Sequence, residues 1–322
     1  MDALQASAVQ NASDIVHNAI ELGDRSALII YDEDYGLTTI LANAYRTALP
    51  NAEFINFNSI SNDKIIAKFE SLLPGDLVIL IQSTNFLLNE FRIRLRLFEM
   101  KLKVIEHLHL MRNSPDIWDV YINSLAYDKS YYRVLGPALQ SKLAKCNEIK
   151  IVSGDAILTI TGGLEYPKSN IGDYTGMENI GGTFPIGEVF TEAKSFENIN
   201  GELYIYAYAG SDFKVDKHVP FKIKIENGLV TSWDNAPLSF KAIMDMVHMY
   251  ERPLIRELGF GLNRAITSDR YPQDITAFER ILGLHVSLGE KHSVYKKPGI
   301  TTHKTKFHID LFPTVDAVYA DG

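Results

Sequence analysis

The segment KTKFHIDLF, residues 304–312, places an imidazole and a carboxylate two positions apart. Alternate side chains of a strand lie on one face, so His308 and Asp310 would face one way and their apolar neighbours the other. Such a pair can bind one divalent ion, or two adjacent ions, without distorting the backbone. For a lone pair of this kind, a solvated strand face is the alternative interpretation.

Three further segments carry a metal-ligating side chain in apolar surroundings. His285 alternates with apolar residues in ILGLHVSLG, so it would lie on the opposite face of a strand from them. Glu257 in RPLIRELGFGLN and Glu188 in GGTFPIGEVFT are carboxylates in apolar company, where burying an unpaired charge is costly. Taken singly, His285 suits a core histidine and Glu188 a surface loop. Glu257 alone suits a salt bridge to Arg256 or Arg264.

Considered jointly, these side chains predict a divalent-metal site. Three carboxylates and two imidazoles form an oxygen and nitrogen ligand set, and the negative charge offsets part of the charge of one or two ions. An ion held in this way can polarise water or a carbonyl group, which favours metal-assisted peptide hydrolysis. The predicted ligands are Glu188, Glu257, His285, His308 and Asp310.

The four segments GEVFT, RELGFG, LHVSLG and HID resemble, in order and setting, the metal-binding motifs of the M29 family of metallo-aminopeptidases, the aminopeptidase T and S group. The resemblance spans most of the C-terminal half and implies the same five ligands. It also implies a dinuclear centre, commonly zinc, cobalt or manganese, in a homodimer that removes N-terminal residues from peptides.

The chain departs from the family pattern at one catalytic position. The family has a tyrosine seven residues after the histidine of its HxxLG motif, and His292 stands there in LHVSLGEKHSVY. We expect His292, or a glutamate such as Glu188, to move a proton to the leaving amine. A solvated turn over residues 290–292 is the alternative. The order of residues around Glu257 also differs and the chain is shorter than typical members, which leaves a catalytically degenerate peptide-binding protein as another interpretation.

A second enzyme class uses a similar ligand set. Two histidines and one carboxylate suit iron(II) and oxygen chemistry. The M29 family resembles ring-cleaving dihydroxypyridine dioxygenases, which have a related fold and a similar HxD segment. A non-haem iron dioxygenase is therefore the alternative enzyme, although Glu188 and Glu257 favour hydrolysis.

Residues 1–150 alternate between strand and helix patterns. Repeated strand–helix units predict a largely parallel sheet that is covered on both faces. The first strand runs into DEDYG, without the glycines of a dinucleotide-binding turn, so we expect a Rossmann-like domain with no nucleotide motif. The predicted strands are 27–31, 53–57, 77–81 and 104–110, and the predicted helices are 37–49, 64–73 and 86–103.

Residues 151–322 predict a mixed α+β domain that carries the metal site. In FKIKIENGLVTSW, alternating residues flank Asn227 and Gly228, a pair typical of a tight hairpin turn. Another strand is predicted at 202–209 and a helix at 239–253. Two glycine pairs lead into no phosphate-binding sequence and predict turns at 162–163 and 181–182.

The composition limits the number of domains, the binding partners and the cellular compartment that we expect. With 322 residues, 46% of them hydrophobic, the chain is long enough for two domains. A net charge of −8 provides no global attraction for nucleic acid or an anionic membrane. One cysteine, Cys146, excludes an intramolecular disulfide, and the N-terminus lacks the pattern of a signal peptide. We therefore expect a cytoplasmic protein.

Overall fold

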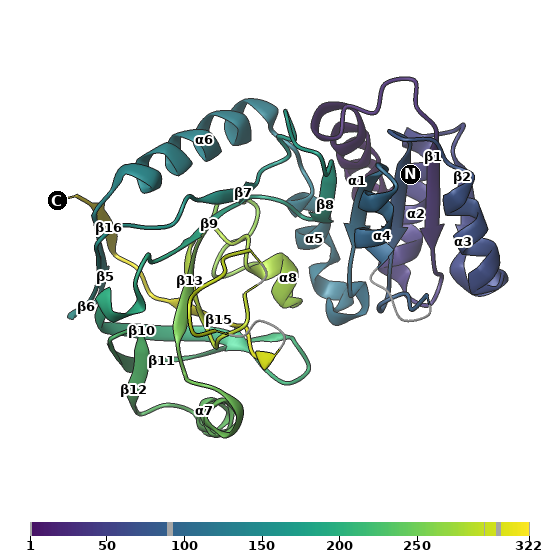
Figure 1. Cartoon of the computed structure of the whole chain (residues 1–322). Helices are drawn as coiled ribbons and strands as arrows, with labels where there is room; N and C mark the ends of the chain where they lie inside the picture. The colour runs from purple at the N-terminus through teal and green to yellow at the C-terminus, as the bar shows by residue number, and fades with distance from the viewer. Residues whose placement is uncertain (1, 89–92, 293, 301–303, 322) are drawn as a thin grey trace. The chain divides into compact units, whose positions relative to one another are not determined.

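The computed structural model describes residues 2–88, 93–292, 294–300 and 304–321. The chain forms two compact units, each assembled from separate stretches of sequence (Figure 1). Unit 1 comprises Met1–Val134, Asn170–Gly187 and Asn263–Phe278, and unit 2 comprises Leu135–Ser169, Glu188–Leu262 and Glu279–Gly322. The two units are groups of residues that contact one another, and they do not test the domain boundary predicted at residue 150, which stays a prediction.

Unit 1 is built on a parallel sheet with the strand order β2-β1-β3-β4-β8. Every residue of the two central strands β1 and β3 is buried, as their uniformly apolar sequences predict. The strands are β1 (Ala27–Tyr31), β2 (Glu53–Asn56), β3 (Leu77–Ile81), β4 (Lys103–His107) and β8 (Gly181–Phe184).

Helices lie on both faces of this sheet because the chain reverses direction across it. It passes outward from β1 to β2 and then back to β3, and right-handed crossovers place the two connecting helices on opposite faces. Side chains of α3 and α4 share one apolar core with β1, β3 and β4. The helices of unit 1 include α1 (Ala3–Asp14), α2 (Gly36–Ala48), α3 (Asn62–Glu70), α4 (Ile93–Glu99), α5 (Trp118–Ser124) and α8 (Ile275–Phe278).

Three local predictions differ from the structure. The strand predicted at 104–110 is β4, which ends at His107, and Leu110 begins a short 3₁₀-helix. The turn predicted at Gly181 and Gly182 is wrong, because both residues lie in β8 and pair with β4. A Cβ at Gly181 would lie 1.8 Å from the carbonyl oxygen of Val104, so close backbone approach explains this glycine better than a turn does. The helix predicted at 86–103 is α4, whose first residue is Ile93; residues 89–92 lie outside the described part of the chain.

Unit 2 is built on a large sheet with the order β16-β5-β6-β10-β15-β14-β13-β9-β7, from which β11 and β12 branch at β10. The strands around the predicted ligands pair in antiparallel fashion. The strands are β5 (Glu148–Ser153), β6 (Ala156–Thr161), β7 (Lys168–Asn170), β9 (Glu188–Glu192), β10 (Ile199–Ala209), β11 (Val215–Glu226), β12 (Leu229–Asp234), β13 (Ile255–Gly261), β14 (Gly283–Leu288), β15 (Ile309–Pro313) and β16 (Ala317–Ala320).

The predicted hairpin is confirmed: β11 and β12 pair on either side of Asn227 and Gly228, which both have positive φ. The remaining α-helices of the described residues are α6 (Lys129–Lys145) and α7 (Leu238–Tyr250), and α7 matches the predicted helix at 239–253. The fold class is also confirmed, because a parallel α/β sheet precedes an antiparallel sheet with helices. Within the described residues, no helix has the length and apolar character needed to cross a membrane.

Candidate metal centre

Strand β13 forms the middle of the candidate centre, between β9 and β14. The register places Glu188 of β9 opposite Gly261, and His285 of β14 opposite Gly259. Directly opposed residues lie on the same face, and Glu257 shares that face by alternation along β13. Because Gly259 has no side chain, His285 has room to lean across β13 toward Glu257, whereas the space beside Gly261 is filled by the backbone of Arg280 and Ile281.

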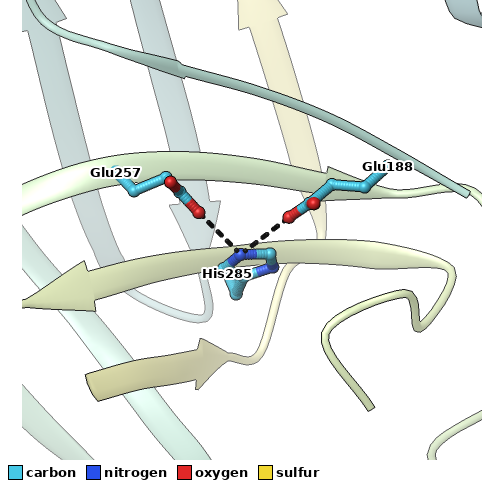
Figure 2. A group of neighbouring side chains, drawn as sticks. All are labelled: Glu188, Glu257 and His285. Carbon is cyan, nitrogen blue, oxygen red and sulfur yellow. Dashed lines mark ion pairs between the residues drawn. The ribbon is translucent and has the colours of Figure 1, made fainter. Parts of the chain in front are cut away.

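The two glutamates converge on one imidazole. The Nε2 atom of His285 lies 3.3 Å from Oε1 of Glu188 and 3.5 Å from Oε1 of Glu257. Figure 2 shows the two carboxylates approaching this nitrogen from either side. One ligand atom from each residue lies within 4.8 Å of the others, which is close enough to surround a single ion.

Strand β15 adds the remaining predicted ligands. Asp310 pairs with Ser287, so it lies on the same face of the sheet as His285. His308 directly precedes β15, and its Nε2 atom lies 3.2 Å from Oδ1 of Asp310 and 4.0 Å from Oε1 of Glu257. Its Nδ1–H donates to the carbonyl of Lys291 at 3.0 Å, which leaves Nε2 facing the carboxylates. The structure therefore gathers all five predicted side chains in one place.

Buried polar atoms without a hydrogen-bond partner mark this centre. Within the described part of the chain they include Oε1 of Glu188, both ring nitrogens of His285 and Oδ1 of Asp310. Such atoms normally find partners, because leaving them unsatisfied costs free energy. A divalent ion would satisfy the oxygens and one imidazole nitrogen, and the donor set suits it. This buried cluster of Glu, His and Asp could therefore hold a metal ion.

Burial and charge oppose each other in the centre. Burial disfavours the charged forms, yet the nearby His285 and the hydrogen bond with His292 lower the pKa of Glu257 below its usual range. Burial alone would lower the pKa of both histidines. The carboxylates outweigh it: Glu188 and Glu257 raise the pKa of His285, and Asp310 raises the pKa of His308 to about 10. Without an ion, protons on the imidazoles therefore balance the carboxylates.

His292 is buried, so the alternative of a solvated turn is wrong. Its Nε2 lies 2.7 Å from Oε2 of Glu257, and its Nδ1 accepts the backbone N–H groups of Val294 at 3.1 Å and Tyr295 at 3.3 Å. Because Nδ1 accepts, the imidazole proton lies on Nε2 and is donated to Glu257. His292 thus orients the second oxygen of Glu257, while the first oxygen faces His285.

Two adjacent side chains that sequence patterns did not single out also belong to the cluster. The buried Arg280 donates from Nη1 to Oε2 of Glu188, and its Nη2 lies 2.8 Å from Oε1 of Glu279. A carboxylate oxygen of Glu279 also lies within 4.8 Å of ligand atoms of His285 and Asp310. The only sign of these two residues in the sequence was the adjacent acidic and basic pair that Glu279 and Arg280 form shortly before the apolar strand β14.

The simple alternatives for the two glutamates fail. Neither arginine is paired with Glu257: Nε of Arg256 lies 2.6 Å from Oε2 of Glu192, and Nη2 of Arg264 lies 2.7 Å from Oδ2 of Asp128. Glu188 is not a surface residue, since only 4% of it is exposed. Of the five predicted ligands, His308 has the most exposed side chain, at 29%, so it marks the side of the centre that solvent can reach.

The sequence matches no protein-family model and no curated protein. By structure, the chain is similar in fold to two solved structures. One is 2,5-dihydroxypyridine dioxygenase from Pseudomonas putida KT2440, with 15% identity and a TM-score of 0.65. The other is wild-type AmpT from Thermus thermophilus, with 10% identity and a TM-score of 0.60. Each comparison covers 98% of this chain and 94% of the other, and at these identities the likeness concerns the fold alone.

Proposed function

We propose that the protein is a metal-dependent aminopeptidase-like hydrolase that removes N-terminal residues from peptides. The observation that carries this proposal is the buried convergence of Glu188, Glu257 and His285, with Asp310 and His308 beside them. Similarity in fold to AmpT, an M29 aminopeptidase, supports it. We propose zinc, cobalt or manganese as the metal, because carboxylate and imidazole ligands suit these ions.

The five predicted ligands would hold the ion, which when bound supplies Lewis-acid polarisation of a carbonyl and a more acidic water. Glu188 keeps one oxygen free of Arg280, and this oxygen would be its ligand atom for the ion. His292 holds Glu257 in place through its Nε2 proton. The exposed edge at His308 is where a peptide would enter.

A peptide library tests this proposal. Protein loaded separately with zinc, cobalt or manganese is incubated with peptides of differing N-terminal residues, and the products are identified by mass spectrometry. Stepwise loss of N-terminal residues is expected. An Asp310→Asn preparation with the same fold controls for contaminating peptidases. Intact peptides with every metal would overturn the proposal, and stoichiometric peptide binding without turnover would indicate a degenerate binding protein.

A specific observation also supports the dioxygenase alternative. Arg280 engages one carboxylate oxygen of Glu188, and His292 engages one of Glu257. The buried Oδ1 of Asp310, which has no hydrogen bond, lies 3.2 Å from Nε2 of His308. His285, His308 and Asp310 would then form the two-histidine, one-carboxylate set typical of non-haem iron. Similarity in fold to a dihydroxypyridine dioxygenase is consistent with this set. Oxygen uptake that requires iron(II) and 2,5-dihydroxypyridine would favour this enzyme over the peptidase.

The resemblance to M29 enzymes also leads us to propose a homodimer. Light scattering coupled to size-exclusion chromatography tests this, and a mass of one chain, near 36.2 kDa, at working concentration would exclude it.

A further inference from the structure

A permanent positive charge lies inside the candidate centre. Arg280 is 6% exposed, and its guanidinium donates to Oε2 of Glu188, one of the predicted ligands. The same guanidinium contacts Glu279, whose carboxylate is itself near His285 and Asp310. Arg280 is therefore a member of the ligand cluster rather than a charge on its rim.

The guanidinium limits what Glu188 can do. Glu188 cannot bridge two ions with one oxygen on each, because Arg280 takes Oε2 and leaves only Oε1. That remaining oxygen has no hydrogen-bond partner and lies 3.3 Å from Nε2 of His285. Glu188 can therefore serve one ion through one oxygen.

Charge repulsion acts in the same direction. Paired ions in two-metal hydrolases lie about 3.5–4 Å apart, so each ion adds to the positive charge that the other must tolerate. An ion on the Glu279 side of the cluster would lie close to a buried guanidinium, and arginine does not lose its proton in proteins. The three groups of candidate ligands form one continuous cluster, because each pair of groups shares one residue: Glu257, His285 or Asp310.

We propose that the centre takes a single divalent ion and that Arg280 occupies the place of a second. This inference rests on the proposed metal-dependent function and departs from the dinuclear centre that the M29 resemblance implies. It assigns Arg280 a defined positioning role: the side chain fixes Glu188 as a ligand with one available oxygen.

Metal counting tests the inference without any measurement of activity. Full-length protein is saturated with manganese(II) or cobalt(II), freed of excess metal and analysed for ions per chain by mass spectrometry. Electron paramagnetic resonance of the manganese form then distinguishes isolated ions from coupled pairs. The variants are Arg280→Glu, which adds a carboxylate, Arg280→Met, which removes the charge but keeps a long side chain, and Arg280→Lys as the charge-conserving control.

We expect one ion per chain in the wild type and in Arg280→Lys, and a second, magnetically coupled ion in Arg280→Glu. If Arg280→Glu does not fold, Arg280→Met decides, with a second ion again expected at high metal concentration. Two ions in the wild type would overturn the inference while leaving the proposed function intact. No ion in the wild type with any metal would overturn the proposed function itself. One ion in every folded variant would show that Arg280 does not set the number.

Discussion

At the residue scale, Asp310 and His308 test the candidate centre most directly. They meet at 3.2 Å, and each supplies a different ligand type. Replacing either residue with alanine should lower metal affinity by more than the ~10–100-fold typical of an outer-shell partner. Calorimetric titration measures this, with circular dichroism to verify the fold. His17→Ala, at an exposed position, is the control. Wild-type affinity in both variants would contradict the ligand assignment.

His292 should act through Glu257 rather than through an ion of its own. His292→Ala removes the Nε2 donor that lies 2.7 Å from Oε2 of Glu257, so we expect a loss of ~10–100-fold in metal affinity and a lower peptidase rate. His292→Gln keeps an amide donor at a similar reach and should recover most of the affinity. Equal loss in both variants would mean that the imidazole ring itself, not its proton, is required.

The protonation of His308 predicts a pH dependence of metal binding. Burial opposes protonation, but Asp310 and Glu257 raise the pKa of His308 to about 10 in the metal-free chain. Because the pKa of His308 is higher in the folded chain than the value of about 6.5 in the unfolded chain, its protonation stabilises the folded state. This contribution is complete below about pH 6.5 and is lost as the pH rises toward 10. Since metal binds neutral imidazole, binding must displace this proton.

We therefore expect metal affinity to increase between about pH 6.5 and pH 10, while the metal-free chain loses stability over the same interval. Titration calorimetry in buffers of different ionisation enthalpy counts the released protons. A binding enthalpy that is the same in every buffer would show that no proton is displaced.

At the element scale, Gly259 of β13 leaves room for the imidazole of His285 from β14. A Cβ at this position would lie 2.2 Å from Nε2 of His285, although the strand backbone itself would accept alanine. Gly259→Ala should displace the imidazole, destabilise the protein by about 1–3 kcal/mol and weaken metal binding. Gly210→Ala is the matched control, because its nearest neighbour is a side-chain oxygen of Asp212 at 3.2 Å.

Denaturant unfolding and metal titration of the two glycine variants measure the effect. If Gly259→Ala binds metal as the wild type does, His285 can move aside without cost, and its position over β13 is not required for the site.

At the scale of the whole molecule, metal removal should destabilise unit 2. Its predicted ligands come from β9, β13, β14 and the start of β15, so an ion would join segments that are distant in sequence. Metal at about 1,000 times its Kd should add about 4 kcal/mol to the free energy of unfolding. A chelator should lower the Tm and increase amide exchange in β13 and β14. Amides of β1 and β3, which belong to unit 1, serve as the internal control.

Local sequence patterns were sufficient for the fold class and for several elements. Uniformly apolar runs predicted the buried strands β1 and β3, and the Asn227-Gly228 pair predicted the hairpin. These features depend on neighbouring residues, since strand burial follows side-chain type and turn geometry follows φ preferences. The types of the candidate ligands were readable for the same reason, because carboxylates and imidazoles in apolar strands require partners.

Only the tertiary structure determined which groups complete the cluster. Arg280 reaches Glu188 across 92 positions of sequence, and β8 joins β4 although its glycines suit a turn. His292 is buried because backbone amides and Glu257 satisfy both of its nitrogens. Such contacts are set by strand register and by the distance between side chains from separate segments. Neither quantity can be read from the local periodicity of the sequence. A single sequence therefore identifies candidate ligands but does not show that the guanidinium of Arg280 lies beside them.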